Sequence, residues 1–202
     1  MFEEESKKCE GDRREYFRID DQVLLNIRPL EEAAMAEVAE RIHGRTPDRF
    51  TVAANFAVNS RAMARLLHGF SANSPDAARY LKLMDQKLNQ LAGLFVAEEV
   101  HSGDYPRLNV NLSAGGLVFP AHQEYTKGQL LETRMVLYPN MTGILTISRV
   151  VYCERLASLP GDIPWQVAVE YVHIRESDRD LLCSHIMNRE TELLRGQRHV
   201  EE

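Results

Sequence analysis

The hydrophobic residues of this chain change their spacing twice, and this change limits the folds that are possible. Val23 to Ile27 is a short β-branched and aliphatic run that is typical of a strand. From about 30 to 101, large apolar residues recur three and four positions apart, as they do on amphipathic helices. From about 106 to 173, short apolar segments alternate with Pro, Gly, Asn and Asp, which again indicates strands. A long helical segment therefore interrupts a chain that is otherwise rich in strands.

The helical stretch predicts one short helix and two long ones. Glu31 to His43 is rich in Ala and Glu, and Gly44 is a plausible stop. The first long helix covers Phe50 to Phe70, and Ser74-Pro75 then offers an N-cap residue followed by proline at the first helical position. Because the turn between the long helices is short, we expect them to form an antiparallel pair.

The rest of the chain predicts a small β structure that is closed by a helix. The strand candidates are 108–112, 117–119, 130–137, 143–152 and 165–174. Several short strands at such intervals favour an antiparallel barrel or sandwich. Residues from 177 to about 195 predict a C-terminal helix, whereas the charged residues 1–12 are expected to be flexible.

Composition and charge argue against several classes of function. The chain has 202 residues, of which 44% are hydrophobic and 27% charged, as in an ordinary soluble globular protein. A formal net charge of −6 argues against binding to nucleic-acid polymers or anionic membranes, so an anionic ligand needs a local basic cluster. No apolar run approaches the roughly 18 residues of a membrane span, and the acidic start does not resemble a signal peptide. We therefore expect a cytoplasmic protein.

Residue types that hold metals or act as nucleophiles show no matching pattern. Cys9, Cys153 and Cys183 are too far apart for a CxxC site, and we expect Cys153 and Cys183 to be buried free thiols. The histidines lack HxxxH and HExxH spacing, and no P-loop or GxGxxG motif is present. Ser113 lacks the leading glycine of a GxSxG motif. The expectation is a protein with no metal, no cofactor and no enzymatic activity.

Two polar clusters carry the chemistry that the sequence offers. The first is Arg14-x-x-x-Arg18, with Arg13 beside it, just before the first strand. Arginine forks match phosphate oxygens bidentately and also pair with the O6/N7 edge of guanine. The second cluster begins with Asn111 and Ser113, which should point to the same side of a strand and offer an amide and a hydroxyl.

Gly115 and Gly116 complete the second cluster. Glycines permit a positive φ and a close approach of ligand to the backbone, where free amides can hold an anion. Taken separately, the arginines are also compatible with a solvated basic segment, and the second cluster with ordinary turn chemistry. Taken together, the two clusters predict a site for an anionic guanine nucleotide that lacks hydrolytic machinery.

The two clusters resemble the paired signature of PilZ domains, RxxxR followed by (D/N)xSxxG. The resemblance covers residues 13–28 and 106–195. It implies a bacterial six-stranded antiparallel PilZ β-barrel that binds the second messenger cyclic di-GMP. It also implies that the arginines grip phosphates and guanine from a linker ahead of the barrel, while the second cluster forms the barrel-side wall. The expected ligand-binding residues are Arg13, Arg14, Arg18, Asn111, Ser113, Gly115 and Gly116.

The helical stretch at about 30–101 departs from an ordinary PilZ domain and resembles a subgroup that oligomerises through long heptad-bearing helices. We therefore expect an α+β fold spanning 13–202, a barrel with a long helical hairpin inserted after the first strand and a C-terminal helix. The apolar stripes of the hairpin are either core or an interface, and the small barrel favours an interface in a homo-oligomer. The expected interface residues are Phe56, Asn59, Met63, Leu81, Met84, Leu88, Leu91 and Phe95.

Within that stripe Asn59 is either a register-setting polar residue, like the buried asparagines of coiled coils, or an exposed position. The function that the resemblance implies is a receptor whose Arg13–Arg18 segment is mobile when free and becomes ordered on binding, which changes the surface seen by an unidentified downstream protein. One alternative is an oligomeric PilZ-fold scaffold that does not bind cyclic di-GMP and acts through its helices. Another is a ligand-independent adaptor in motility or pilus biogenesis.

Overall fold

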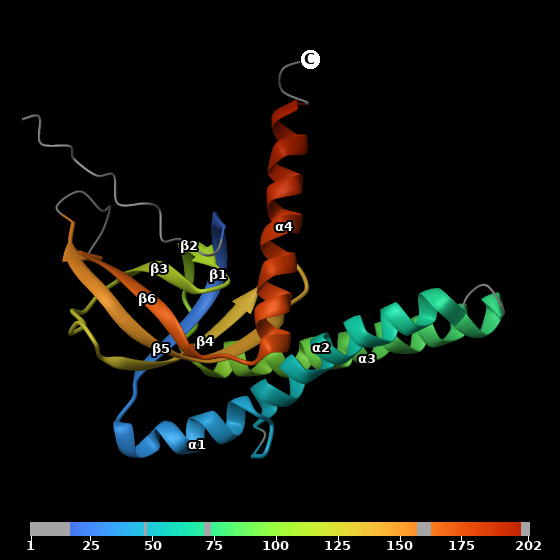
Figure 1. Ribbon diagram of the computed structural model, residues 1–202, viewed down its shortest axis with the longest axis horizontal. Coiled ribbons are helices and arrows are strands. Elements are labelled where there is room, and N and C mark those ends of the chain that lie inside the picture. Colours follow the sequence, from blue (N-terminus) through green and yellow to red (C-terminus); the bar gives the residue numbers. More distant parts are fainter. Residues whose placement is uncertain (1–16, 47, 71–73, 157–162, 199–202) are drawn as a thin grey trace, which may run out of the picture.

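The structure is a computed structural model, and it describes residues 17–46, 48–70, 74–156 and 163–198 (Figure 1). The strands are β1 (Arg18–Pro29), β2 (Arg107–Ser113), β3 (Gly116–Ala121), β4 (Leu130–Leu137), β5 (Thr142–Arg155) and β6 (Trp165–His173). The helices are α1 (Glu32–Ile42), α2 (Arg49–Phe70), α3 (Pro75–Ser102) and α4 (Glu176–Arg198). The three helices α1 to α3 follow the first strand and α4 closes the chain, which confirms the predicted order of elements.

The strands form a closed antiparallel barrel in the order β1-β2-β3-β6-β5-β4. The barrel closes because β1 is long enough to pair with β2 through its first half and with β4 through its second half. Alternate side chains point inward and fill the barrel, as the period of a strand requires. The fully buried interior residues include Val23, Leu112, Leu131, Met135, Ile144 and Val167. The predicted six-stranded antiparallel barrel is confirmed.

The first strand begins earlier than its apolar run indicated. Its predicted extent was 23–27, but Arg18 already pairs with Ser113 and Asp20 with Asn111. These outward-facing residues are polar, so hydrophobicity gives no sign of them, and only the ladder with β2 reveals the strand. Arg18 therefore lies at the start of β1 in the barrel, and the expectation that it belongs to a linker ahead of the barrel is wrong. Residues 1–16, which include Cys9, Arg13 and Arg14, lie outside the described residues.

Helices α2 and α3 form an antiparallel hairpin that extends away from the barrel (Figure 1). A second apolar cluster joins the base of the hairpin to the outer surface of the barrel. The fully buried Phe50 packs there with Tyr105 and Val136, and its ring covers Gly143. A Cβ atom at position 143 would lie 3.0 Å from that ring, so a side chain there would require the ring to shift. At the end of α1, Gly44 has a φ of +75°, consistent with its predicted role as a helix stop.

An ionic network also fastens the hairpin to the barrel. Arg134 of β4 is buried, and its guanidinium contacts Glu132 at 2.8 Å, Asp48 at 2.9 Å and Glu99 at 3.1 Å. Asp48 precedes α2 and Glu99 lies near the end of α3, so one arginine joins a strand to both ends of the hairpin base. A buried guanidinium is tolerated here because its charge and its N–H groups find several carboxylate partners.

Helix α4 begins at the barrel and then leaves it. Leu182 and Ile186 belong to the barrel core, whereas Met187, Leu193 and Leu194 are exposed. Among the helices of the described residues, none combines the length and the apolar composition that crossing a membrane requires. Cys153 and Cys183, the two cysteines that the structure describes, are free, half-buried and packed against the core, close to the predicted buried thiols.

Candidate functional site

The β1–β2 ladder brings the two polar clusters together on the outer face of the barrel. Arg18 Nη1 donates to Asn111 Oδ1 at 3.3 Å, and Asn111 Nδ2 donates to Asp20 Oδ1 at 2.8 Å. Arg18 and Asp20 are exposed, and Asn111 is half-buried. An arginine and a side-chain amide therefore stand side by side at the surface, where they are open to a ligand. Arg13 and Arg14 are not among the described residues.

Ser113 shapes the turn between β2 and β3. Its Oγ accepts hydrogen bonds from the amides of Gly115 at 3.3 Å and Gly116 at 3.1 Å, and it donates to the carbonyl of Gly116 at 3.0 Å. Ser113 is only 3% exposed. The prediction that these two amides are free to hold an anion is wrong, because a serine two or three residues away satisfies them locally.

Gly116 is required by the packing of the strands. A Cβ atom at this position would lie 2.1 Å from the carbonyl oxygen of Val169 on β6, a distance that no real side chain tolerates. The backbone of Gly116 is not left-handed, so the expected positive φ is not what this residue provides. The glycine that the signature contains thus allows β3 and β6 to approach each other closely, and it holds the turn against the barrel.

A row of side chains continues from the polar cluster across the outer face. The strand registers place Asp20 opposite Asn111, Asn111 opposite Val118, Val118 opposite Ala168, and Ala168 opposite Tyr152. A register shift between Val150 and Tyr152 accompanies the outward position of the tyrosine, which is 36% exposed. The row passes from polar at β1 to apolar and aromatic at β5, so it could hold both a charged group and a flat ring. Alternation along single strands could not predict it, because the row depends on the register between strands.

An exposed ion pair borders this surface on the outside, and a buried tyrosine lies beneath it. Arg149 and Glu170 form an exposed ion pair at 3.2 Å, and Glu170 is opposite Gly116. On the inner side, Tyr171 is buried, and burial raises the pKa of its hydroxyl while the charges of Arg18 and Arg179 act in the opposite direction. Within the described residues no group of three or more His, Cys, Asp or Glu side chains could hold a metal ion. The outer face, with Arg18 on β1 and Tyr152 on β5, is suited to binding an anion and a ring.

No protein-family model matches the chain, and no curated protein matches it significantly. Among solved structures, it is similar to that of a pathogenic protein from Xanthomonas campestris, a tetrameric PilZ domain that self-assembles via an unusual helical bundle. The two chains share 9% identity with a TM-score of 0.56, over 89% of this chain and 91% of the other. The chain folds as a PilZ domain.

Two further solved structures are similar to the chain with lower scores. The inhibitor of motility MotI/DgrA of Bacillus subtilis is 15% identical with a TM-score of 0.46, and the match covers 89% of this chain and 52% of that one. The PilZ domain of YcgR from Escherichia coli, solved with c-di-GMP, is 13% identical with a TM-score of 0.37, and the match covers 46% and 78% of the two chains.

The apolar stripes of the hairpin lie on the surface of the PilZ chain. Asn59 is exposed and Phe56 is half-buried. The other predicted interface residues are between 38% and 55% exposed, namely Met63, Leu81, Met84, Leu88, Leu91 and Phe95. Further large apolar residues of the hairpin, outside the predicted interface set, are also exposed, namely Val52, Leu66, Tyr80, Leu83 and Leu94. The stripe is therefore not part of the core of a single chain.

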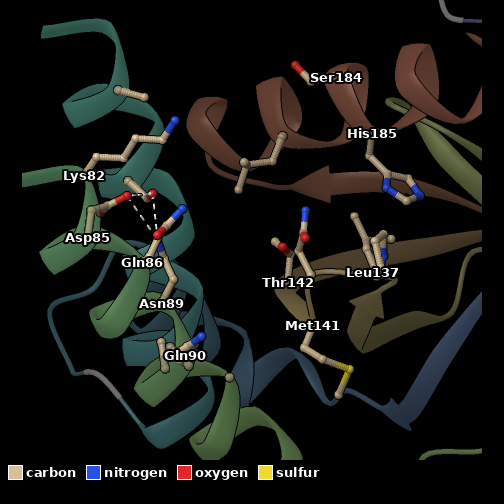
Figure 2. A pocket seen from close by; sticks show the side chains of 18 of the residues that line it. Lys82, Asp85, Gln86, Asn89, Gln90, Leu137, Met141, Thr142, Ser184 and His185 are labelled. Carbon is tan, nitrogen blue, oxygen red and sulfur yellow. Dashed lines mark hydrogen bonds between the residues drawn. The ribbon is translucent and has the colours of Figure 1, made fainter. Parts of the chain in front are cut away.

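A cleft of about 1250 Å³ separates the hairpin from α4 (Figure 2). Lys82, Asp85 and Asn89 line the wall that the hairpin provides, and His185 lines the wall of α4. On the hairpin side, Ser60 Oγ donates to Asp85 Oδ2 at 2.5 Å, and Asn89 Nδ2 donates to Ser60 Oγ at 2.8 Å. No local sequence pattern predicts this cleft, because its walls come from segments that are far apart in the chain.

Proposed function

We propose that this PilZ-fold protein is a receptor for cyclic di-GMP and not an enzyme. The observation that carries the proposal is the contact between Arg18 and Asn111, which joins the two signature clusters on an exposed face of the barrel. A guanidinium binds phosphate oxygens or the O6/N7 edge of guanine, and an amide can pair with a base edge. The phosphates and the guanine bases of a cyclic guanine dinucleotide thus both find a partner on this face.

The remaining residues of the face have supporting roles in this proposal. Arg13 and Arg14 add phosphate contacts ahead of Arg18. The row from Val118 through Ala168 to Tyr152 offers an apolar surface on which a purine can lie. Ser113, Gly115 and Gly116 keep the turn in shape, and they contribute to binding indirectly by holding Asn111 in place. Binding then changes the surface that the protein presents to a downstream partner.

Isothermal titration calorimetry with cyclic di-GMP tests this function, with GTP and cyclic GMP as control ligands. We expect the wild-type protein to bind cyclic di-GMP selectively, and the double variant Arg14→Ala/Arg18→Ala to lose binding. Arg45→Ala is the matched control variant, because Arg45 is an exposed arginine that pairs with Glu40 at the end of α1 and lies outside the candidate site. Micromolar binding that survives in the double variant would overturn the assignment of the site.

A second candidate function is an oligomeric scaffold that acts through the hairpin, alone or together with ligand binding. The observation that favours it is the large number of exposed apolar side chains on α3, from Leu81 to Phe95. Monomeric proteins rarely expose contiguous apolar patches of this kind. A second copy of the hairpin offers the same apolar face and is the occupant that we propose. Light scattering that shows a monomer at tens of micromolar would remove this candidate.

A further inference from the structure

Helix α4 contacts β1 directly behind the candidate site. Asp21 follows Asp20 on β1, and because successive side chains of a strand point to opposite faces, it turns away from the ligand face. His185 Nε2 of α4 lies 2.6 Å from Asp21 Oδ2, and Arg189 Nη2 lies 3.2 Å from Asp21 Oδ1. Asp21 is buried, so these contacts are shielded from solvent. Strand β1, which carries Arg18, is thus linked to α4 through Asp21 on the side opposite the ligand face.

The same helix also contacts the turn of the second cluster. Arg179 Nη1 donates to the carbonyl oxygen of Ala114 at 3.0 Å. Ala114 lies in the turn whose amides bind Ser113 Oγ, and the neighbouring carbonyl of Gly115 accepts from the amide of Tyr171. One helix therefore contacts both segments that form the ligand face. Arg179 contacts the turn between β2 and β3, and His185 and Arg189 contact β1.

The docked part of α4 is short and well defined. Leu182 and Ile186 anchor it in the barrel core, and Asp178 forms an ion pair with Arg175 at 2.8 Å. Beyond Ile186 the apolar side chains of α4 are exposed, and in Figure 1 the helix continues away from the barrel. Arg179 lies in the docked part, and Arg189 lies about one turn beyond Ile186, where it still reaches Asp21.

These contacts matter electrostatically because the protein as a whole is acidic. The net charge is −6, and Asp20 and Asp21 are adjacent to the candidate site. Arg189 offsets the charge of Asp21 but also pairs with Glu192 at 2.8 Å, and Arg179 lies 3.9 Å from Glu176, so these arginines balance carboxylates and do not make the region positive. Charges separated by protein interior are screened less than charges in water.

We propose that α4 positions the ligand site from behind: Arg179 and Arg189 hold its two segments together, and Arg189 offsets the negative charge of Asp21 behind a site for an anionic dinucleotide. This inference rests on the proposed function. Because coupling between two events is reciprocal, ligand binding stabilises the docking of α4, and loss of docking weakens binding. His185 links Asp21 to the wall of the cleft that faces the hairpin (Figure 2), so occupancy of the site is transmitted to that surface.

Calorimetry on the full chain tests the positioning role. We expect Arg189→Met to lower the affinity for cyclic di-GMP about fivefold or more. Arg195→Met is the matched control, because Arg195 is an exposed arginine of the same helix on the part that has left the barrel. It should change the affinity less than about twofold, since exposed charges beyond a Debye length are largely screened. Arg189→Lys, which retains the charge but not the fork, should fall between these two variants.

Hydrogen exchange supplies a readout that a purely structural role would not move. In the wild-type protein, saturating cyclic di-GMP should slow the exchange of amides 179–190 about fivefold or more. Equal affinities of Arg189→Met and Arg195→Met would overturn the inference, as would unchanged exchange in protein that calorimetry shows to be saturated; both results would leave the proposed function intact. No binding to the wild-type protein would overturn the proposed function and this inference together. If Arg189→Met does not fold, Arg189→Lys and the wild-type exchange decide.

Discussion

Arg18 Nη1 and Asn111 Oδ1 lie 3.3 Å apart on the outer face of the barrel, although 93 residues separate them in the chain. The contact depends on the pairing of β1 with β2, in which Arg18 is opposite Ser113 and Asp20 is opposite Asn111. All three helices of the insert lie between these two strands in sequence and leave their pairing intact. Side chains of this ladder can therefore be substituted one at a time to test the proposed ligand site.

Asn111→Ala should lower the affinity for cyclic di-GMP about tenfold, because a hydrogen bond to a base edge and the support of Arg18 are lost together. Calorimetry measures this change. Asn109→Ala is the control, since Asn109 lies two residues earlier on the same face of β2 and bonds to Gln22 at 3.2 Å. If both variants bind as the wild type does, Asn111 is not part of the ligand site.

Gly116→Ala should destabilise the fold by about 2 to 3 kcal/mol, because the new methyl group would meet the carbonyl of Val169 and push β3 away from β6. Urea denaturation followed by circular dichroism measures this free energy of unfolding. Gly93→Ala is the control, since nothing lies within 4 Å of a Cβ atom at that position of α3. It should be neutral or stabilise the helix by about 0.5 to 1 kcal/mol. Equal stability of the two variants would contradict the packing role of Gly116.

Arg134→Met should cost about 3 kcal/mol of unfolding free energy, because Glu132, Asp48 and Glu99 each lose an ion-pair partner, while Arg41 still pairs with Glu132 and Asp48. Chemical denaturation gives the value. Arg149→Met removes an arginine from the exposed pair with Glu170 and should cost less than about 1 kcal/mol. A similar loss in both variants would mean that the network at the hairpin base does not stabilise the protein.

Asp21 should make stability depend on pH in the acid range. Burial by itself raises the pKa of Asp21, but hydrogen bonds from His185 and the amide of Gln22, with the charges of His185 and Arg189, hold it below its usual value. Because the folded pKa lies below the unfolded value of about 3.9, the carboxylate contributes stability above about pH 4 and loses it as the pH falls through the folded pKa. The melting temperature should therefore fall less steeply with acid in Asp21→Asn than in the wild type. Asp20→Asn, which changes an exposed neighbour, should retain the wild-type slope.

Leu91→Glu should convert a homo-oligomer into a monomer, because a charge would be placed in the apolar face that we propose to pair with another copy. Leu91 is 55% exposed in the single chain, so the substitution should not disturb the fold. Size-exclusion chromatography with light scattering reports the change in mass. Met187→Glu is the control, since Met187 is also exposed but lies on α4. Dissociation by both variants would place the interface elsewhere or imply two interfaces.

Local patterns were sufficient to predict most of the elements. The three-four spacing of apolar residues located α2 and α3, and the Ser74-Pro75 pair marked the start of α3. Strand β4 matches its predicted range of 130–137. These features depend on the preferences of neighbouring residues, which are present in the sequence itself. The start of β1 was missed, because Arg18 and Asp20 belong to the strand only through their partners on β2.

The roles of individual polar residues were harder to predict from the sequence. Ser113 matched a ligand-binding pattern, yet its hydroxyl is used by the amides of its own turn. Arg134 lies in the predicted strand 130–137, and two of its partners come from the start of α2 and the end of α3. No local signal indicates such a network, because its stability depends on three carboxylates that the fold brings together.

The sequence by itself determined which segments are helical or extended. Only the tertiary structure decided the register of the barrel, the row from Asp20 to Tyr152, and the placement of α4 behind it. The physical reason is the range of the interactions. Periodicity and turn chemistry act between near neighbours, whereas a ladder, an ion pair or a docked helix depends on residues that only the closed barrel brings into contact.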